Sequence, residues 1–238
     1  MGSERAQCPL TFTDRRFQCT TFPASGGSLR RPAGRDKLGD LRAIIRLTAI
    51  REALKRLEPV LLRPWSETAG RAAVALVLAG PEDDLRLCFI QRATRKGDHW
   101  SGQMAFPGGR AEARDPTPRA VAERETREEV GLVLDGAEYL GRLSELRIRH
   151  SGVVTKDVLS PFVYYAGVEL PHLETSEEVA DTFWIPLRQL WDEHNATTFE
   201  YERQGDPVRL PGIRFGDRII WGLTYMMFES FTEAVGAP

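Results

Sequence analysis

The chain has few cysteines, no long apolar run and no excess of charge of one sign. Its three cysteines, Cys8, Cys19 and Cys88, form no CxxC pair. This excludes a disulfide framework and a zinc site, and it fits a reducing compartment. Lys and Arg number 32 against 34 Asp and Glu, so the chain lacks the basic signature of nucleic-acid-binding proteins. No apolar run approaches the ~20 residues that span a bilayer. We therefore expect neither a nucleic acid nor a membrane as a partner.

The first part of the chain differs in composition from the rest. Residues 1–38 contain more Arg and Lys than acids, several Ser and Thr, and no hydrophobic periodicity, which predicts a loosely ordered extension. The absence of the apolar core of a secretory signal favours a cytoplasmic location. Because mitochondrial transit peptides share such a composition, a mitochondrial location stays open as the alternative. Residues 39–69 are predicted to form a helix and a linker that pack on the main domain, which spans residues 70–238.

The hydrophobic patterns alternate between strands and helices. Apolar residues repeat at helical spacing between residues 38 and 58, and Pro59 stops the pattern. Short apolar runs at 72–79 and 85–91 flank a turn and predict a hairpin. Strands among two or three helices predict an α/β sandwich with a mixed β-sheet. Further on we expect strands at 139–149, 158–166 and 180–185, a short helix at 188–194, a hairpin of 199–203 with 208–214, and a closing helix at 217–234.

The most informative stretch carries three glutamates at helical spacing. Glu125, Glu128 and Glu129 lie at i, i+3 and i+4, so on a helix their carboxylates fall within an arc of about 100°. Like charges this close repel one another unless cations neutralise them. Hard oxygen ligands suit Mg²⁺ or Mn²⁺, ions that usually act on phosphate substrates. The pattern therefore predicts a metal-dependent enzyme acting on phosphates.

The boundaries of this helix are marked by residues suited to helix ends. Asp115 is suited to the N-cap, and Pro116 to the first helical position, where its missing N–H costs nothing. Gly131 is suited to the left-handed residue that ends a helix. The predicted helix spans residues 116–130.

The segment from Gly109 to Leu132 resembles the Nudix box, the signature of hydrolases that cleave nucleoside diphosphates linked to another moiety. The half that contains Arg124 and the glutamates matches the family pattern. The upstream half differs, because the usual glutamate is replaced by Asp115, with one extra residue before Arg124. This variant is similar to the coenzyme A pyrophosphatase branch of the superfamily. The sequences Phe106-Pro107-Gly108-Gly109 and Trp221-Gly222-Leu223-Thr224 are also similar to that branch.

The resemblance implies a Nudix-type α/β/α sandwich and a set of roles inside the box. Glu128 and Glu129 would coordinate the divalent cations, and Glu125 would be either a further ligand or the base that accepts a proton from the attacking water. Arg124 would hold Glu125 or its neighbours in place by charge-assisted hydrogen bonds. Asp115 would either orient Arg124 or ligate metal through water.

The glycine-rich loop before the box is the expected substrate-binding loop. Because Gly108 and Gly109 have no Cβ, backbone carbonyls in this turn can approach the metal.

Residues outside the box complete the predicted site. The coenzyme A branch has an upstream pattern that starts with an arginine followed by Ser or Ala, which Arg92-Ala93 matches. Its second arginine is replaced by Gly97, although Arg95 and Lys96 lie nearby. Together with Arg92, these two residues are suited to bind a substrate phosphate. We select Glu178 as the additional acid, either ligand or general base, that many Nudix enzymes take from a loop outside the box.

The expected activity is metal-dependent cleavage of the diphosphate of CoA or acyl-CoA to 3′-phospho-AMP and (acyl-)phosphopantetheine. The departure at Gly97 leaves open another nucleoside diphosphate derivative, such as ADP-ribose or a dinucleotide. A non-catalytic nucleotide-binding Nudix module is a third alternative, although such modules are expected to lose the ligand glutamates that this chain keeps. Some family members are homodimers, and no feature of the sequence decides the oligomeric state.

Overall fold

The computed structural model describes residues 45–62, 64–65, 70–96, 100–150, 153–203 and 206–237. The predicted extension, residues 1–38, lies outside these ranges, as do the first residues of the predicted N-terminal helix. In chain order the elements are α1 (Leu47–Arg56), β1 (Arg71–Ala79), β2 (Arg86–Arg92), β3 (Met104–Ala105), β4 (Gly108–Arg110), α2 (Pro118–Val130), β5 (Glu138–Arg142), β6 (Leu146–His150), β7 (Val153–Tyr165), β8 (Val179–Pro186), α3 (Leu187–Leu190), the 3₁₀ helix η1 (Glu193–Asn195), β9 (Ala196–Arg203), β10 (Asp206–Phe215), β11 (Arg218–Trp221) and α4 (Gly222–Val235).

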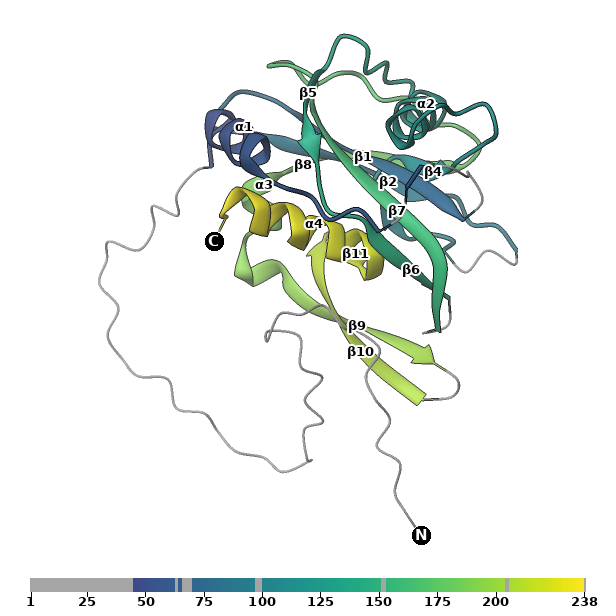
Figure 1. Ribbon diagram of the computed structural model, residues 1–238. Helices are drawn as coiled ribbons and strands as arrows, with labels where there is room; N and C mark the ends of the chain where they lie inside the picture. Colours follow the sequence, from purple (N-terminus) through teal and green to yellow (C-terminus); the bar gives the residue numbers. More distant parts are fainter. Residues whose placement is uncertain are drawn as a thin grey trace, which may run out of the picture.

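An eight-stranded mixed sheet forms the centre of the molecule, with the strand order β3-β2-β1-β7-β5 (Figure 1). Strand β1 runs parallel to β7 and antiparallel to β2 and β4. Strand β8 extends the sheet beside β2, and β6 pairs with β7. The predicted hairpin of 72–79 with 85–91 is therefore confirmed.

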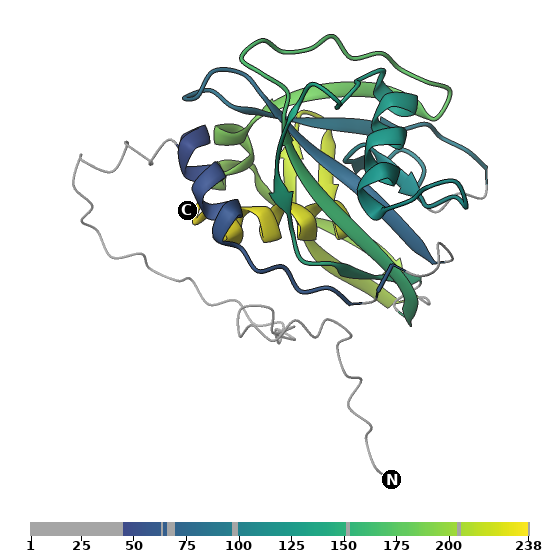
Figure 2. The ribbon, with the colours of Figure 1, turned by 45° about the horizontal axis from the view of Figure 1, so that its top comes forward.

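Strand β1 separates two hydrophobic cores because its side chains alternate between the faces of the sheet. Val74, Leu76 and Leu78 pack in the core that α1 and α4 cover. Ala73, Ala75 and Val77 pack in the core that α2 covers. Figure 2 shows α1 beside α4, and Figure 1 shows α2 on the other face of the sheet. The arrangement confirms the predicted α/β/α sandwich with a mixed sheet.

A smaller antiparallel sheet, in the order β11-β10-β9, carries a long hairpin that projects from the main body (Figure 1). Phe199 and Trp221 stack within this sheet with ring centroids 3.9 Å apart. The hairpin predicted at 199–203 and 208–214 is confirmed. In the described part of the chain, no helix combines the length and the apolar character needed to cross a membrane.

The prediction for the start of the glutamate helix is wrong by two residues. The N-cap is Thr117, whose hydroxyl accepts a hydrogen bond from the Ala120 N–H at 3.1 Å, and Pro118 occupies the first helical position. Asp115 and Pro116 lie before the helix, since the Asp115 carboxylate binds Arg124 instead of capping. The predicted end is confirmed, because Gly131 adopts a left-handed conformation with φ 70°.

Three other predicted elements are divided in the structure. The short helix expected at 188–194 consists of α3 and the 3₁₀ helix η1, with Trp191 and Asp192 between them. The strand expected at 139–149 is interrupted between β5 and β6, where Glu145 turns inward to meet buried Arg71 and Ser160. The closing helix expected at 217–234 begins as strand β11. Gly216 and Asp217 form a two-residue turn that pairs β11 with β10, and α4 starts only at Gly222.

Candidate active site

Helix α2 presents the three predicted carboxylates at graded depths beside the glycine-rich loop. The side chain of Glu128 is 45% exposed and that of Glu125 is 15% exposed. Glu129 is buried, with a relative exposure of 4%. The buried face of α2 packs on β1 and β4, so the deeper carboxylates face the loop as the spacing predicts.

Arg124 is the centre of the ionic network on this helix. Its Nε and Nη2 donate to the two carboxylate oxygens of Asp115 at 3.1 and 3.0 Å. Its Nη1 lies 3.0 Å from Glu125 Oε1 and 2.9 Å from Glu128 Oε2. Nη2 also donates to the Arg110 carbonyl at 3.0 Å. The guanidinium therefore connects the loop before α2 with both carboxylates that lie nearer the solvent.

Asp115 is buried, and its partners already occupy both carboxylate oxygens. Besides the bidentate contact with Arg124, its Oδ2 accepts the Glu112 N–H at 2.7 Å. Burial would raise the pKa of Asp115, but the hydrogen bonds from Arg124 and the Glu112 N–H outweigh burial and lower it. Of the two roles predicted for Asp115, this geometry favours the orientation of Arg124.

The two glycines lie where side chains would collide with the site. Gly108 adopts φ 154°, and a Cβ there would lie 2.6 Å from Val74 Cα. A Cβ on Gly109 would overlap the Glu125 carboxylate. The Gly108 N–H donates to Glu129 Oε2 at 2.8 Å. The loop thus uses the small volume of glycine to approach both β1 and the carboxylates of α2.

Burial and like charge shift the titration of the two deeper glutamates. Burial raises the pKa of Glu129 to about 8; the Gly108 hydrogen bond opposes this rise, while the charges of Glu125 and Glu178 add to it. Burial also raises the pKa of Glu125; the Arg124 charge opposes this, and the charges of Glu128 and Glu178 add to it. A cation beside these carboxylates would favour their ionised forms.

The chemistry of these residues fits a hard divalent cation. Glu125, Glu128 and Glu129 offer only oxygen donors, the ligand type that Mg²⁺ and Mn²⁺ prefer. Within the ranges that the structure describes, no three carboxylate, histidine or cysteine side chains converge closely enough to hold an ion. Protein groups bind the carboxylates instead: Arg124 contacts Glu125 and Glu128, and the Gly108 N–H contacts Glu129. Cation binding would exchange some of these contacts for metal ligation.

Of the four residues predicted outside the box, Arg92 and Glu178 act electrostatically on these carboxylates, and Arg95 is connected to them through Glu178. Arg92 ends β2, and its charge opposes the rise in the Glu129 pKa that burial causes. Arg95 Nη1 lies 3.0 Å from Glu178 Oε1, and the charge of Glu178 acts on Glu125 and Glu129. Lys96 is exposed at the end of the described range 70–96, and Gly97 lies outside the described residues.

The sequence reasoning missed two contributions from the loop between Gly109 and α2. Arg114 Nη2 lies 3.3 Å from Glu128 Oε1, and the Arg110 carbonyl accepts from Arg124. Surface charges in a loop carry no recognisable spacing, and a backbone carbonyl leaves no mark in the sequence. The only available signal was the density of charge in residues 110–114.

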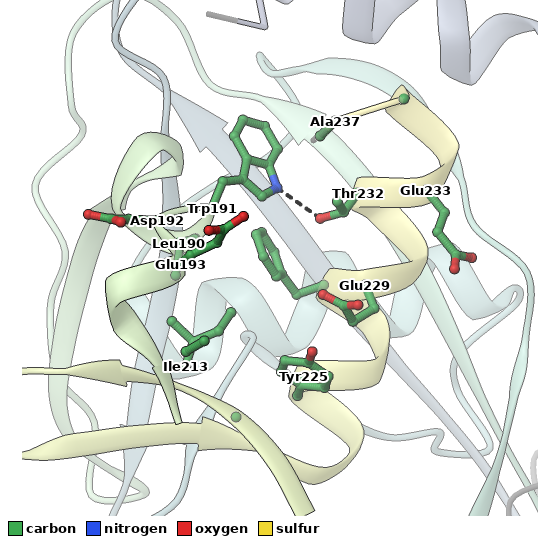
Figure 3. Close-up of a pocket in the computed structure, with 14 residues that line it drawn as sticks. Leu190, Trp191, Asp192, Glu193, Ile213, Tyr225, Glu229, Thr232, Glu233 and Ala237 are labelled. Carbon is green, nitrogen blue, oxygen red and sulfur yellow. Dashed lines mark hydrogen bonds between the residues drawn. The ribbon is translucent and has the colours of Figure 1, made fainter. Parts of the chain in front are cut away.

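A surface cavity of about 610 Å³ lies between α3, β10 and α4 (Figure 3). Trp191 and Phe228 line it, and the Trp191 Nε1–H donates to Thr232 Oγ1 at 2.9 Å. None of the predicted site residues lines this cavity, so it is separate from the carboxylates of α2.

Comparisons with known proteins identify the family of this chain. Residues 69–203 match the family model described as NUDIX domain. The chain is 31% identical over 175 residues to an uncharacterized Nudix hydrolase, NudL, of Yersinia pestis (strain Pestoides F), covering 72% of this chain and 82% of the relative. NudL of Yersinia pseudotuberculosis serotype O:1b gives the same values.

Solved structures with a similar arrangement include a MutT/nudix family protein from Enterococcus faecalis, at 18% identity and a TM-score of 0.46, covering 80% of this chain and 70% of that one. A C. elegans Ap4A hydrolase complex has 14% identity and a TM-score of 0.41, covering 50% of this chain and 82% of that one. On the domain match and the Yersinia relatives, this chain belongs to the Nudix family and is a hydrolase of pyrophosphate bonds.

Proposed function

We propose that this Nudix hydrolase uses Mg²⁺ or Mn²⁺ to cleave the diphosphate of CoA or acyl-CoA, yielding 3′-phospho-AMP and (acyl-)phosphopantetheine. The observation that carries the catalytic part is the burial of Glu125 and Glu129 against the Gly108–Gly109 loop, with Glu129 bound to the Gly108 N–H. The substrate assignment is supported by Phe106-Pro107-Gly108-Gly109, by Arg92-Ala93 upstream and by Trp221-Gly222-Leu223-Thr224 downstream.

Glu125, Glu128 and Glu129 are the proposed metal ligands. They are the carboxylates of α2 beside the glycine loop, and their mutual repulsion is greatest when no cation is bound. When bound, the cation neutralises charge on the diphosphate and increases the acidity of the attacking water. Asp115 is assigned to positioning Arg124, since Arg124 and the Glu112 N–H already use its oxygens.

Proton transfer is assigned to Glu125 or Glu178. Glu125 is well placed, because burial raises its pKa toward the range in which a carboxylate accepts a proton efficiently. Its contact with Arg124 Nη1 at 3.0 Å restrains the carboxylate beside Gly109. Glu178 lies in the turn before β8, where it pairs with Arg95, and its charge acts on Glu125 and Glu129.

Arg92, Arg95 and Lys96 are the proposed substrate-binding cations. All three lie at or just after the end of β2, and the charge of Arg92 already acts on Glu129. The Arg95–Glu178 pair is half exposed on both sides, and such pairs contribute only about 0–1 kcal/mol. A substrate phosphate can therefore replace Glu178 as the partner of Arg95 at little cost.

The substrate class is tested by comparing kcat/KM for CoA, ADP-ribose and a dinucleotide with Mg²⁺ and with Mn²⁺. A preference for CoA supports the proposed branch. Preference for either of the others keeps the pyrophosphatase chemistry and overturns the CoA assignment. That alternative is motivated by the replacement of the expected second arginine by Gly97.

Metal binding should stabilise the fold measurably. A ligand at 100 times its Kd adds about 2.7 kcal/mol to the free energy of unfolding, so Mn²⁺ should raise the Tm of the wild type. The increase should disappear in Glu128→Gln. The matched control is Glu123→Gln on the same helix, which should keep the full Mn²⁺ response because Glu123 pairs with Arg119. An unchanged response in Glu128→Gln would contradict the ligand assignment.

A further inference from the structure

The segment Trp221-Gly222-Leu223-Thr224 lies at the junction of β11 and α4, and none of its residues belongs to the proposed site. Trp221 ends β11 and stacks on Phe199 of β9. Gly222 adopts φ 64°, which turns the chain from the strand into the helix. Thr224 is the third residue of α4, and it is buried with a relative exposure of 7%. The junction therefore directs Thr224 into the interior.

The Thr224 hydroxyl binds another element of the fold. It donates to the Met104 carbonyl at 3.0 Å. Met104 is buried and belongs to β3, a two-residue strand at the end of the sheet that pairs with β2 on one side only. By contrast, buried Thr126 in α2 donates to the Ala122 carbonyl of its own helix. The Thr224 hydrogen bond thus joins α4 to the unpaired side of β3.

A short, fully anchored stretch of chain connects Met104 to the metal-binding carboxylates. Phe106 is buried against Phe89, with ring centroids 4.7 Å apart. The Pro107 carbonyl accepts the Ala75 N–H at 2.8 Å. The next residue, Gly108, donates its N–H to Glu129 at 2.8 Å. Residues 104–108 thus form a continuous path from the Met104 carbonyl to the Gly108 N–H that binds Glu129.

We propose that Thr224 is a positioning residue for the glycine loop: its hydroxyl fixes the Met104 carbonyl, and through residues 104–108 it sets where the Gly108 N–H meets Glu129. The role rests on the proposed function of the site. It assigns a purpose to the C-terminal segment that resembles the coenzyme A branch. We expect this effect because a buried carbonyl that loses a side-chain donor relaxes toward another partner.

The test compares Thr224→Val, which removes the hydroxyl at nearly constant volume, with Thr224→Ser, which keeps it. We expect Thr224→Val to lower kcat for CoA roughly tenfold, the change that corresponds to one hydrogen bond, with KM within twofold. Hydrogen exchange in residues 104–110 should be faster in the metal-free variant. Thr224→Ser should restore both values. If Thr224→Val fails to fold, Thr224→Ala provides the same comparison.

The matched control is Thr232→Val on the same helix. Thr232 accepts the Trp191 Nε1–H at 2.9 Å, so this variant loses a hydrogen bond of α4 without touching β3. It should leave kcat and exchange in residues 104–110 unchanged. Wild-type exchange in Thr224→Val, no recovery in Thr224→Ser, or an equal effect of Thr232→Val would overturn the proposal. Because exchange is measured without substrate, it decides the role of Thr224 even if the wild type cleaves no CoA, a result that would count against the proposed function alone.

Discussion

The Glu125→Gln variant is expected to lose at least about 10²-fold in turnover, the scale of a lost general base or metal-positioning group. This corresponds to about 2.7 kcal/mol of transition-state stabilisation. Glutamine has nearly the same shape as glutamate, but its amide does not accept a proton near neutral pH and is a weaker ligand for a divalent cation. Because Asp115 and Glu128 still bind Arg124 in the variant, the helix should keep its place. Initial rates with saturating Mg²⁺ and CoA measure the effect.

Glu123→Gln is the control for this experiment. Glu123 lies on the same helix, accepts from the Tyr164 hydroxyl at 3.0 Å and pairs with Arg119. We expect its turnover to stay close to that of the wild type. Turnover of Glu125→Gln within a factor of two of the wild type would remove Glu125 from the mechanism and move the proton transfer to Glu178.

The Arg124→Met variant should lose about 3–5 kcal/mol of unfolding free energy, as expected when one partner of a buried ion pair is removed. The side chains of Arg124 and Asp115 are 9% and 4% exposed, so the Asp115 carboxylate would be left buried with the Glu112 N–H as its remaining hydrogen-bond donor. Glu125 and Glu128 would lose a common cation at the same time. Urea denaturation without metal measures the loss.

Two further variants show whether the loss comes from the buried pair. Arg119→Met on the same helix removes an exposed arginine paired with Glu123, and it should cost less than about 1 kcal/mol. The double variant Arg124→Met/Asp115→Asn should be more stable than Arg124→Met, because it removes the uncompensated charge. Equal losses of unfolding free energy in the Arg119 and Arg124 variants would contradict the assignment of Arg124 as the centre of the ionic network.

The glutamate helix could be predicted because its signals are local. The i, i+3 and i+4 spacing of Glu125, Glu128 and Glu129 and the glycine at its end are properties of a few neighbouring residues. The wrong N-cap, Asp115 in place of Thr117, was predicted from the same kind of local signal. Asp115-Pro116 and Thr117-Pro118 both offer a cap followed by proline. The contact of Asp115 with Arg124, nine positions later, decides between them.

Features that depend on long-range partners could not be predicted from local patterns. The break between β5 and β6 follows from Glu145, which pairs with Arg71, 74 positions earlier in the chain. The contact between Thr224 and Met104 joins residues 120 positions apart. The Gly216-Asp217 turn was a local signal for β11, since glycine at such two-residue turns is typical of hairpins, but the apolar residues after it also fit a helix.

The most direct test of the central claim is the mass spectrum of the products formed from CoA in ¹⁸O-water with Mg²⁺ or Mn²⁺. We predict 3′-phospho-AMP and phosphopantetheine, with one ¹⁸O incorporated into one of the two products, and no cleavage when EDTA removes the metal. The label also shows which phosphorus the water attacks. Absence of cleavage of CoA, ADP-ribose and a dinucleotide with either metal would contradict the assignment of a metal-dependent pyrophosphohydrolase site to helix α2.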